Sequence, residues 1–339
     1  MLLTHLPHVR RFVQDALGSD SSFSIVSVAI NLMQAYSEAE ERKPRLALVS
    51  ADFTRLAEFE MMRALFSALD VRWIVLTHEK AGSKADETVT KKNFGIFSVD
   101  VSEGTSALLQ TLRTLTRSPQ AAHRLRTPEN RTSPGTRVSS LSNRVVLIGS
   151  STGGIDALTE VLLRFPEDCP PTFIVQHTGS SFGDSLVRLL NGRCAASVVA
   201  ARDATEIGTG MVCVGAGLDA HVRVAKGAAL SCRLKTAPPV SGHIPSVDEL
   251  FKSALPFAKQ VIACLLTGMG RDGAAGLLEL KKAGARTFVQ DEGSSVVYGM
   301  PKAAWEMGAA EKRVPITRMA DTIFEACGQS VKRNSEIGI

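Results

Sequence analysis

Two patterns of apolar residues alternate along the first 115 residues of the chain. Short continuous apolar runs are typical of strands, whereas apolar residues every three or four positions are typical of amphipathic helices. The runs predict strands over 23–30, 46–50, 73–77 and 93–99, and the spaced positions predict helices near 9–17 and 106–115. Because strands and helices alternate, this segment is predicted to form a small parallel-sheet domain.

The same alternation returns from residue 145 onward. Apolar runs predict strands over 145–148, 172–176, 211–215, 261–266 and 287–290, and helical spacing predicts helices near 155–165, 182–190, 247–258 and 273–283. Ser246 and Glu249 form a capping-box pattern that opens one of these helices, and Pro301 suits the first turn of a further one. We therefore expect an open, doubly wound α/β sheet, whose functional residues gather beyond the carboxyl ends of the strands.

The segment between these two parts has a different composition. Residues 117–143 are rich in Arg, Ser, Pro and Thr and nearly lack large apolar residues, so burial cannot offset the entropy of ordering them. The predicted organisation is a domain at 1–115, a flexible linker at 116–143 and a second domain at 144–333.

The net charge of +5 lies in this linker, because six arginines and one glutamate fall within 117–144. Aromatic residues that could stack on bases are missing there, so the sequence predicts no nucleic-acid partner. No run approaches the roughly 18 apolar residues of a membrane span. The N-terminus also lacks the apolar block of a signal peptide, so we expect a cytoplasmic protein without membrane insertion.

The six cysteines are scattered without a C-x-x-C pair, and the seven histidines show no metal-ligand spacing. The cysteines are expected to be core thiols in a reducing compartment. The sequence therefore predicts neither a metal site nor a cofactor.

One predicted strand ends in a turn that can expose a nucleophile. Ser151 lies in the pattern Gly149-x-Ser151-x-Gly153, between a strand and a helix. Small neighbours permit a sharp turn, and the helix start supplies free N–H groups and a positive dipole. A serine placed there can attack a carbonyl carbon. The alternative is a glycine-rich turn that binds phosphate or is purely structural.

Two other strand ends carry an imidazole and a carboxylate. His177 follows the strand 172–176, and Asp272 lies between the strand 261–266 and a helix. His177 could be an ordinary polar residue and Asp272 could simply cap its own helix. Together with Ser151, however, they supply a nucleophile, a base and a group that orients the base. The glycines Gly268, Gly270 and Gly273 leave backbone N–H groups accessible, so this loop could also donate to an oxyanion.

Two other enzyme classes fit the pattern less well. A dinucleotide-binding fold needs the spacing G-x-G-x-x-G and an acidic residue that ends the second strand, but that strand ends in His177. An ordinary α/β-hydrolase has its catalytic histidine last in the chain, whereas no histidine follows His243. The order serine, histidine, aspartate therefore indicates another arrangement.

Five stretches in the second part carry a resemblance to a known family: IGSSTGG, IVQHTG, GHIPSVDELFKSA, LLTGMGRDGAAGLLELKKAGA and VVYGMPKAAWEMG. Over about residues 144–316 they resemble the catalytic domain of the chemotaxis response-regulator protein-glutamate methylesterase. The resemblance implies a triad of Ser151, His177 and Asp272, with Thr152 helping to orient the histidine and the Met269 N–H donating to the oxyanion. One departure is GAGLDAH at 215–221, where the family usually has Ala-Pro-Gly before the histidine.

The resemblance also implies an activity and partners. Enzymes of this family hydrolyse glutamyl methyl esters on chemoreceptors to glutamate and methanol, and often deamidate receptor glutamines. The implied partners are the cytoplasmic domains of chemoreceptors. A regulatory protein that binds residues 1–115, or autoinhibition that the linker relieves, are both open as means of control.

The family normally carries an N-terminal receiver domain of flavodoxin-like fold, and residues 1–115 resemble one in pattern but not in chemistry. The acidic pair that would bind Mg²⁺ falls on Thr4 and His5, the phosphoacceptor aspartate falls on Ser50, and the lysine falls on Ser98. Thr77 alone matches, at the hydroxyl position. The sequence therefore predicts a receiver-like domain without a phosphorylation site.

Alternatives to this interpretation follow from the same residues. Asp52, two positions beyond Ser50, could replace the missing acceptor. The degenerate receiver motivates a second function, a regulatory or receptor-binding module with a relict hydrolase site. A third is a nucleotide-binding enzyme that uses GSSTGG for phosphate.

Overall fold

The computed structural model describes residues 1–18, 20–56, 59–69, 71–77, 97–117, 144–179 and 182–328. Contacts divide the chain into two compact units, Met1–Arg137 and Val138–Ile339. The predicted linker lies outside the described residues, apart from its first two, which extend the last helix of unit 1 to Arg117. The predicted domain limits therefore stay a prediction.

Unit 1 contains a five-stranded parallel sheet in the order β2-β1-β3-β4-β5. This is the flavodoxin-like order that the resemblance implied. Its strands are β1 (Leu2–Leu3), β2 (Val28–Ala29), β3 (Leu46–Ser50), β4 (Arg72–Thr77) and β5 (Phe97–Asp100). Its helices are α1 (Pro7–Gly18), α2 (Leu32–Arg42), α3 (Ala51–Thr54), α4 (Phe59–Ala68) and α6 (Thr105–Arg117), with a 3-10 turn η1 (Val101–Glu103).

The predicted strand over 23–30 is wrong in length, since only two of its residues join the sheet. Val26 and Ile30 are 46% and 57% exposed, so the apolar run does not enter the core in full. The predicted strand 46–50 is confirmed, and 73–77 is confirmed with one more residue at its start. The first four residues of the predicted strand 93–99 lie outside the described residues.

Unit 2 is built on a seven-stranded parallel sheet in the order β14-β13-β12-β6-β7-β9-β8. The strands are β6 (Val145–Ser150), β7 (Thr172–Gln176), β8 (Ser197–Ala200), β9 (Met211–Ala216), β12 (Val261–Leu265), β13 (Arg286–Gln290) and β14 (Lys312–Val314). An antiparallel hairpin, β10 (His221–Lys226) and β11 (Leu230–Lys235), forms a separate two-stranded sheet. Because β6 and β7 are interior strands, their burial on both faces accounts for the continuous apolar runs.

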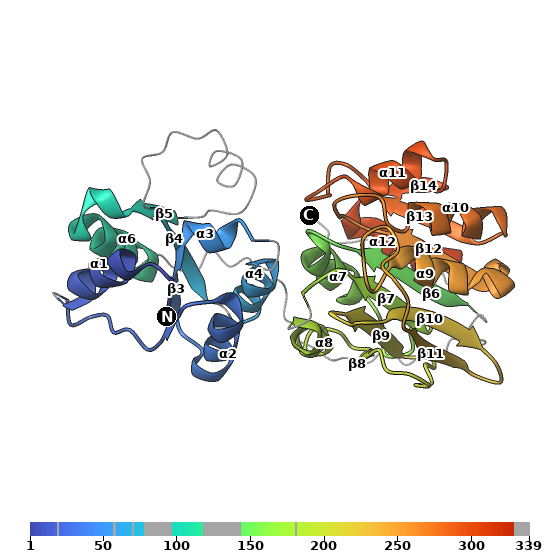
Figure 1. The fold of residues 1–339 in the computed structure, drawn as a ribbon, viewed down its shortest axis with the longest axis horizontal. Coiled ribbons are helices and arrows are strands. Elements are labelled where there is room, and N and C mark those ends of the chain that lie inside the picture. Colours follow the sequence, from blue (N-terminus) through green and yellow to red (C-terminus); the bar gives the residue numbers. More distant parts are fainter. Residues whose placement is uncertain are drawn as a thin grey trace, which may run out of the picture. The chain divides into compact units, whose positions relative to one another are not determined.

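Two groups of helices cover this sheet (Figure 1). In one group α7 (Gly154–Leu162) contacts α8 (Gly183–Asn191) and α12 (Ile316–Ala326). In the other, α10 (Ala274–Lys282) contacts α9 (Val247–Ser253) and α11 (Met300–Glu306), and these three pack with the sheet in one apolar cluster. The doubly wound α/β fold is therefore confirmed. No helix in the described part of the chain is both long and apolar enough to cross a membrane.

Several predicted elements differ in extent. The turn predicted over Gly149–Gly154 is shorter, because β6 continues to Ser150 and α7 begins at Gly154. The helix predicted over 247–258 is α9 followed by a 3-10 segment, η3 (Leu255–Gln260), with Pro256 near its start. Ser246 caps α9 as predicted, and Pro301 lies in the first turn of α11.

Candidate active site

The register of two adjacent strands brings Ser151 and His177 to the same edge of the sheet. In the parallel pair β6 and β7, Ser150 lies opposite Gln176, so the next residue of each strand end is Ser151 and His177. The amide nitrogen of Gln176 donates to the Ser151 carbonyl at 2.9 Å and to the His177 carbonyl at 2.8 Å. Gln176 therefore ties the two strand ends together.

Ser151 occupies a tight turn between β6 and α7. Gly153 has φ 81°, a left-handed conformation that favours glycine. A side chain at Gly154 would meet Gln176, since a Cβ there would lie 2.1 Å from the amide oxygen. The Ser151 N–H donates to the Thr267 carbonyl at 3.0 Å, which fixes the serine to the strand end of β12. The turn therefore needs small residues because it is sharp, as the sequence predicted.

His177 and Asp272 form a hydrogen bond of 2.9 Å between Nε2 and Oδ2. A carboxylate can only accept, so Nε2 carries the proton and Nδ1 carries the free lone pair. Nδ1 is buried and has no hydrogen-bond partner among the described residues. Neither ring nitrogen of His177 therefore bonds to the Ser151 hydroxyl in this structure. Such bonds are often long before substrate binds.

Asp272 does not cap its own helix; Gly273 occupies the cap position of α10. Its carboxylate instead accepts from the first turn of α9: from the Val247 N–H at 2.7 Å, the Asp248 N–H at 3.1 Å and the Ser246 hydroxyl at 2.8 Å. Burial on its own raises the pKa of this carboxyl, but hydrogen bonds from His177 and the Val247 N–H outweigh burial and hold the pKa below its usual value. Asp272 is therefore an anion with fixed orientation.

A second imidazole covers one face of His177. The rings of His177 and His243 stack with centroids 3.8 Å apart and an interplanar angle of 8°. Burial lowers the pKa of His243, and the neighbouring His177 lowers it further. A neutral His243 limits the rotation of His177 without adding a repelling charge.

The loop after β12 supplies a free backbone donor. The Gly268 N–H donates to the Val297 carbonyl at 3.0 Å, but no carbonyl of the described residues accepts from the Met269 N–H. The Met269 side chain is 67% exposed at this edge. Thr152 is bonded here through its carbonyl, which lies 2.9 Å from the Thr267 hydroxyl. Neither ring nitrogen of His177 bonds to the Thr152 side chain in this state.

The same edge of the sheet in unit 1 has different chemistry. Ser50, at the end of β3, donates its hydroxyl to the Thr4 hydroxyl at 2.7 Å, and both side chains are buried. In the pairing of β4 with β5, Thr77 lies opposite Asp100, while Ser98 lies opposite Val75. β5 ends at Asp100, two residues beyond Ser98, so this strand end carries a carboxylate. The assignment of the lysine position to Ser98 stays a prediction.

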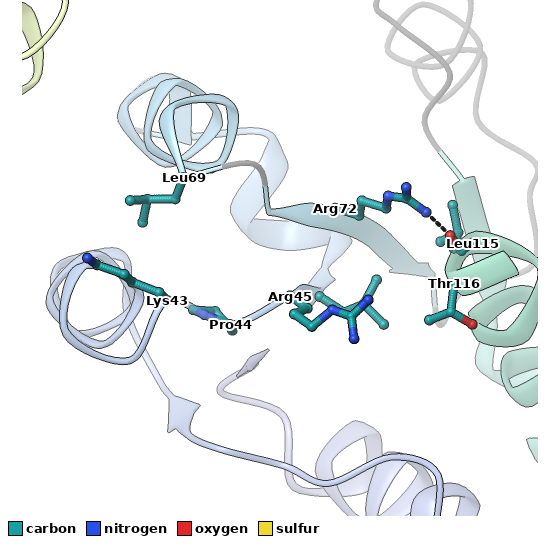
Figure 2. Close-up of a pocket in the computed structure, with 8 residues that line it drawn as sticks. Lys43, Pro44, Arg45, Leu69, Arg72, Leu115 and Thr116 are labelled. Atoms are coloured by element: carbon teal, nitrogen blue, oxygen red, sulfur yellow. Dashed lines mark hydrogen bonds between the residues drawn. The ribbon is translucent and has the colours of Figure 1, made fainter. Parts of the chain in front are cut away.

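Unit 1 also has a small pocket, lined by Lys43, Pro44, Arg45, Leu46, Leu69, Arg72, Leu115 and Thr116 (Figure 2). Arg45 and Leu46 lie where β3 begins, and Arg72 is the first residue of β4. The Arg72 guanidinium donates to the Leu115 carbonyl and so closes one side of the pocket (Figure 2). Because the pocket lies at the amino ends of the strands, it is separate from the edge where a receiver would be phosphorylated.

Metal ligands do not cluster in the part of the chain that the structure covers. Among those residues, no group of three or more His, Cys, Asp or Glu could hold a metal ion. All six cysteines are free. Burial raises the pKa of the Cys169 thiol to about 12, so that thiol stays protonated and unreactive.

Sequence reasoning missed three residues that organise this site. Gln176 bonds to the Ser151 carbonyl, and His243 stacks on the His177 ring. His221 accepts from the N–H of Ser246, whose hydroxyl donates to Asp272. Gln176 could have been noticed because a polar residue ends a buried strand directly before His177. The two histidines had no such signal, because their partners come from distant parts of the chain.

Comparison with known proteins identifies relatives of this site and fold. The family model described as CheB methylesterase matches residues 146–323. A protein-glutamate methylesterase/protein-glutamine glutaminase of Agrobacterium fabrum is 35% identical over 94% of this chain and 93% of its own length. One from Caulobacter vibrioides is 48% identical over 54% of each chain. The crystal structure of the Thermotoga maritima CheB methylesterase catalytic domain matches with a TM-score of 0.52 and 31% identity, over 54% of this chain and 97% of that one.

Proposed function

This chain belongs to the CheB methylesterase family, and on that premise we propose that Ser151, His177 and Asp272 are the residues that carry its reaction. The protein hydrolyses glutamate methyl esters on chemoreceptors to glutamate and methanol, and deamidates receptor glutamines, in chemotaxis adaptation. The cytoplasmic domains of those receptors are the proposed substrates, and the cytoplasm is the proposed location.

Acylation begins at the serine. Nδ1 of His177 accepts the Ser151 proton as the oxygen attacks the ester carbonyl carbon, and Asp272 stabilises the imidazolium that forms. The carbonyl oxygen becomes an oxyanion, to which the Met269 N–H donates. Collapse of this intermediate breaks the bond to the methoxy oxygen. His177 returns the proton to that oxygen, so methanol leaves and the glutamyl group stays on Ser151.

Deacylation repeats the same steps with water. His177 takes a proton from water, which attacks the acyl-enzyme carbonyl, and the proton then returns to Ser151 as the glutamate carboxyl is released. A glutamine side chain reacts in the same way, except that ammonia leaves in place of methanol. One site therefore accounts for both activities in the relatives' names.

The observation that carries this proposal is the bond from His177 to Asp272, which leaves Nδ1 as a buried, unpartnered base next to the serine strand end. The test measures methanol release from methylated receptor membranes by the full chain and by Ser151→Ala. We expect turnover to fall about a millionfold if the triad acts as a unit. A variant that keeps more than a tenth of wild-type activity would reject the assignment, and a wild-type chain that releases no methanol would favour the relict module.

We also propose that unit 1 cannot be switched by aspartyl phosphate. In support, the sequence has Thr4 and His5 where the acidic pair is expected and Ser50 where the acceptor is expected. The buried hydroxyls of Thr4 and Ser50 bond to each other, and hydroxyls do not form the oxygen cage that Mg²⁺ prefers. Incubation of the full chain with acetyl phosphate and Mg²⁺ should leave it unmodified. A stoichiometric acid-labile phosphate, mapped to Asp52 or elsewhere, would contradict this.

A further inference from the structure

A buried histidine outside the proposed triad bridges the two ends of one loop. His221, the first residue of β10, has no exposed surface. Its Nε2 lies 3.0 Å from the Pro238 carbonyl oxygen, and its Nδ1 lies 3.1 Å from the Ser246 backbone nitrogen. A carbonyl only accepts and a backbone N–H only donates, so the ring is neutral, with its proton on Nε2. Both ring nitrogens are then satisfied.

The loop between these two anchors, residues 238–246, contacts both members of the His177–Asp272 pair. His243 stacks on the His177 ring at 3.8 Å, and the Ser246 hydroxyl donates to Asp272 at 2.8 Å. Two backbone bonds between Val240 and His243, of 3.2 and 3.0 Å, close the loop on itself. A shift of the loop would therefore move both contacts together.

The Ser246 end of the loop also sets the start of α9. Ser246 is the N-cap of this helix, and the next two N–H groups, those of Val247 and Asp248, donate to the Asp272 carboxylate. The His221 bond to the Ser246 N–H therefore fixes the start of this turn. Three of the four donors to Asp272 come from the turn: the Ser246 hydroxyl and the next two backbone N–H groups. The fourth donor is His177 itself.

We propose that His221 is a positioning residue, which holds the loop 238–246 so that His243 and Ser246 keep His177 and Asp272 in their reactive geometry. The inference rests on the proposed function of that pair. His221 touches no reacting atom, and its effect passes through the loop alone. A doubly protonated ring could not serve, because it has no acceptor for the Ser246 N–H.

Two substitutions separate the two bonds of His221. In His221→Asn the amide oxygen lies near the place of Nδ1 and can still accept from Ser246, whereas in His221→Gln the amide nitrogen lies near the place of Nε2 and can still donate to Pro238. Each variant loses one hydrogen bond, so their melting temperatures should fall by similar amounts. We expect His221→Gln to lose about tenfold in kcat, because the Ser246 N–H is left unsatisfied. His221→Asn should keep most of its kcat, and KM should change in neither.

The control for stability is Val222→Ala, because Val222 is the next residue of β10 and is also fully buried, but it contributes only packing. Methanol release and thermal melting are measured on the full chain for all three variants. A kcat for His221→Gln within about twofold of both His221→Asn and Val222→Ala, at a similar loss of melting temperature, overturns the inference. Rescue of kcat by Asn but not by Gln supports it.

Ser151→Ala in the same assay keeps the two proposals apart. If Ser151→Ala is inactive while His221→Gln is as active as its controls, only the role of His221 is lost. If Ser151→Ala stays active, the proposed triad itself is wrong.

Discussion

The carboxyl edges of the two parallel sheets have the same backbone plan and different chemistry. Ser50 ends β3 and Ser150 ends β6; both are fully buried, and each donates one side-chain hydrogen bond, of 2.7 and 2.6 Å. Ser50 donates to the Thr4 hydroxyl, which also accepts from the Leu6 N–H at 3.1 Å; among the described residues, these bonds connect it to no imidazole or carboxylate. Ser150 donates to Gln176, which in turn holds the carbonyls of Ser151 and His177.

This difference shows that the fold supplies a place for chemistry but not the chemistry. In unit 2 the register of β6 with β7 sets a hydroxyl beside an imidazole, and the neighbouring strand β12 leads into the loop with the carboxylate. In unit 1 the equivalent strand ends carry Thr4, Ser50, Thr77 and Asp100. The end of β3 therefore carries a serine where a receiver has its acceptor aspartate, and none of these four side chains is an imidazole.

The largest expected effect comes from His177→Gln. The glutamine amide nitrogen lies near the place of Nε2 and can still donate to Asp272, but nothing replaces the base Nδ1. Turnover should fall about a millionfold, as for loss of a whole triad. Methanol release measures this, with thermal melting as the check on folding. More than a tenth of wild-type turnover would mean that His177 is not the base of the reaction.

Asp272→Asn should lower turnover about 10⁴-fold, because a neutral amide does not stabilise the imidazolium. The amide also cannot accept from all four donors that now bond to the carboxylate. Asp248→Asn is the matched control, since Asp248 is a second buried acid close to Asp272, in the first turn of α9, and its carboxylate accepts from the Ser241 hydroxyl and the Gly276 N–H rather than from His177. Equal losses in the two variants would contradict a specific role for Asp272.

Asp272 should also make stability depend on pH. Its pKa is lowered in the folded state, so the unfolded chain takes up a proton more readily as the pH falls. The stabilisation is complete above about pH 4, the ordinary range of an aspartic acid, and is lost as the pH falls further through the lowered pKa. The difference in unfolding free energy between wild type and Asp272→Asn should therefore become smaller as the pH is lowered below about 4. A difference that grows instead would contradict the lowered pKa.

The smallest expected effects come from matched serine substitutions at the carboxyl edges of the two sheets. Ser50→Ala and Ser150→Ala each remove one buried hydrogen bond and should each cost about 1 kcal/mol of unfolding free energy. Only Ser150→Ala frees Gln176, so it alone should lower kcat, by about tenfold. Chemical denaturation and methanol release measure the two quantities. A similar loss of kcat in Ser50→Ala would show that the hydroxyl pair of unit 1 takes part in activity.

Much of the fold was predictable because interior strands have continuous apolar runs. The strand 172–176 is confirmed at both ends, and 46–50 likewise. The hairpin β10–β11 and the short edge strands β8 and β14 were missed. Their residues are partly exposed, and a short, half-buried strand leaves no continuous apolar run.

The candidate triad was predictable because three strand ends carried suitable residue types. Which nitrogen of His177 faces Asp272, and what holds Asp272, were not. Two of the donors to Asp272 are backbone N–H groups of α9, and backbone donors have no residue-type signal in a sequence. His221 was equally hidden, because Pro238 and Ser246 meet it only through the fold of the loop.

The most direct test of the account is the position of the proton on His177. Nitrogen-15 NMR of the imidazoles in the full chain, assigned by comparison with His177→Gln, distinguishes the two ring tautomers. We predict a proton on Nε2, hydrogen-bonded to Asp272 and altered in Asp272→Asn, with Nδ1 unprotonated. A neutral ring with its proton on Nδ1 would leave no base beside Ser151 and would contradict the account.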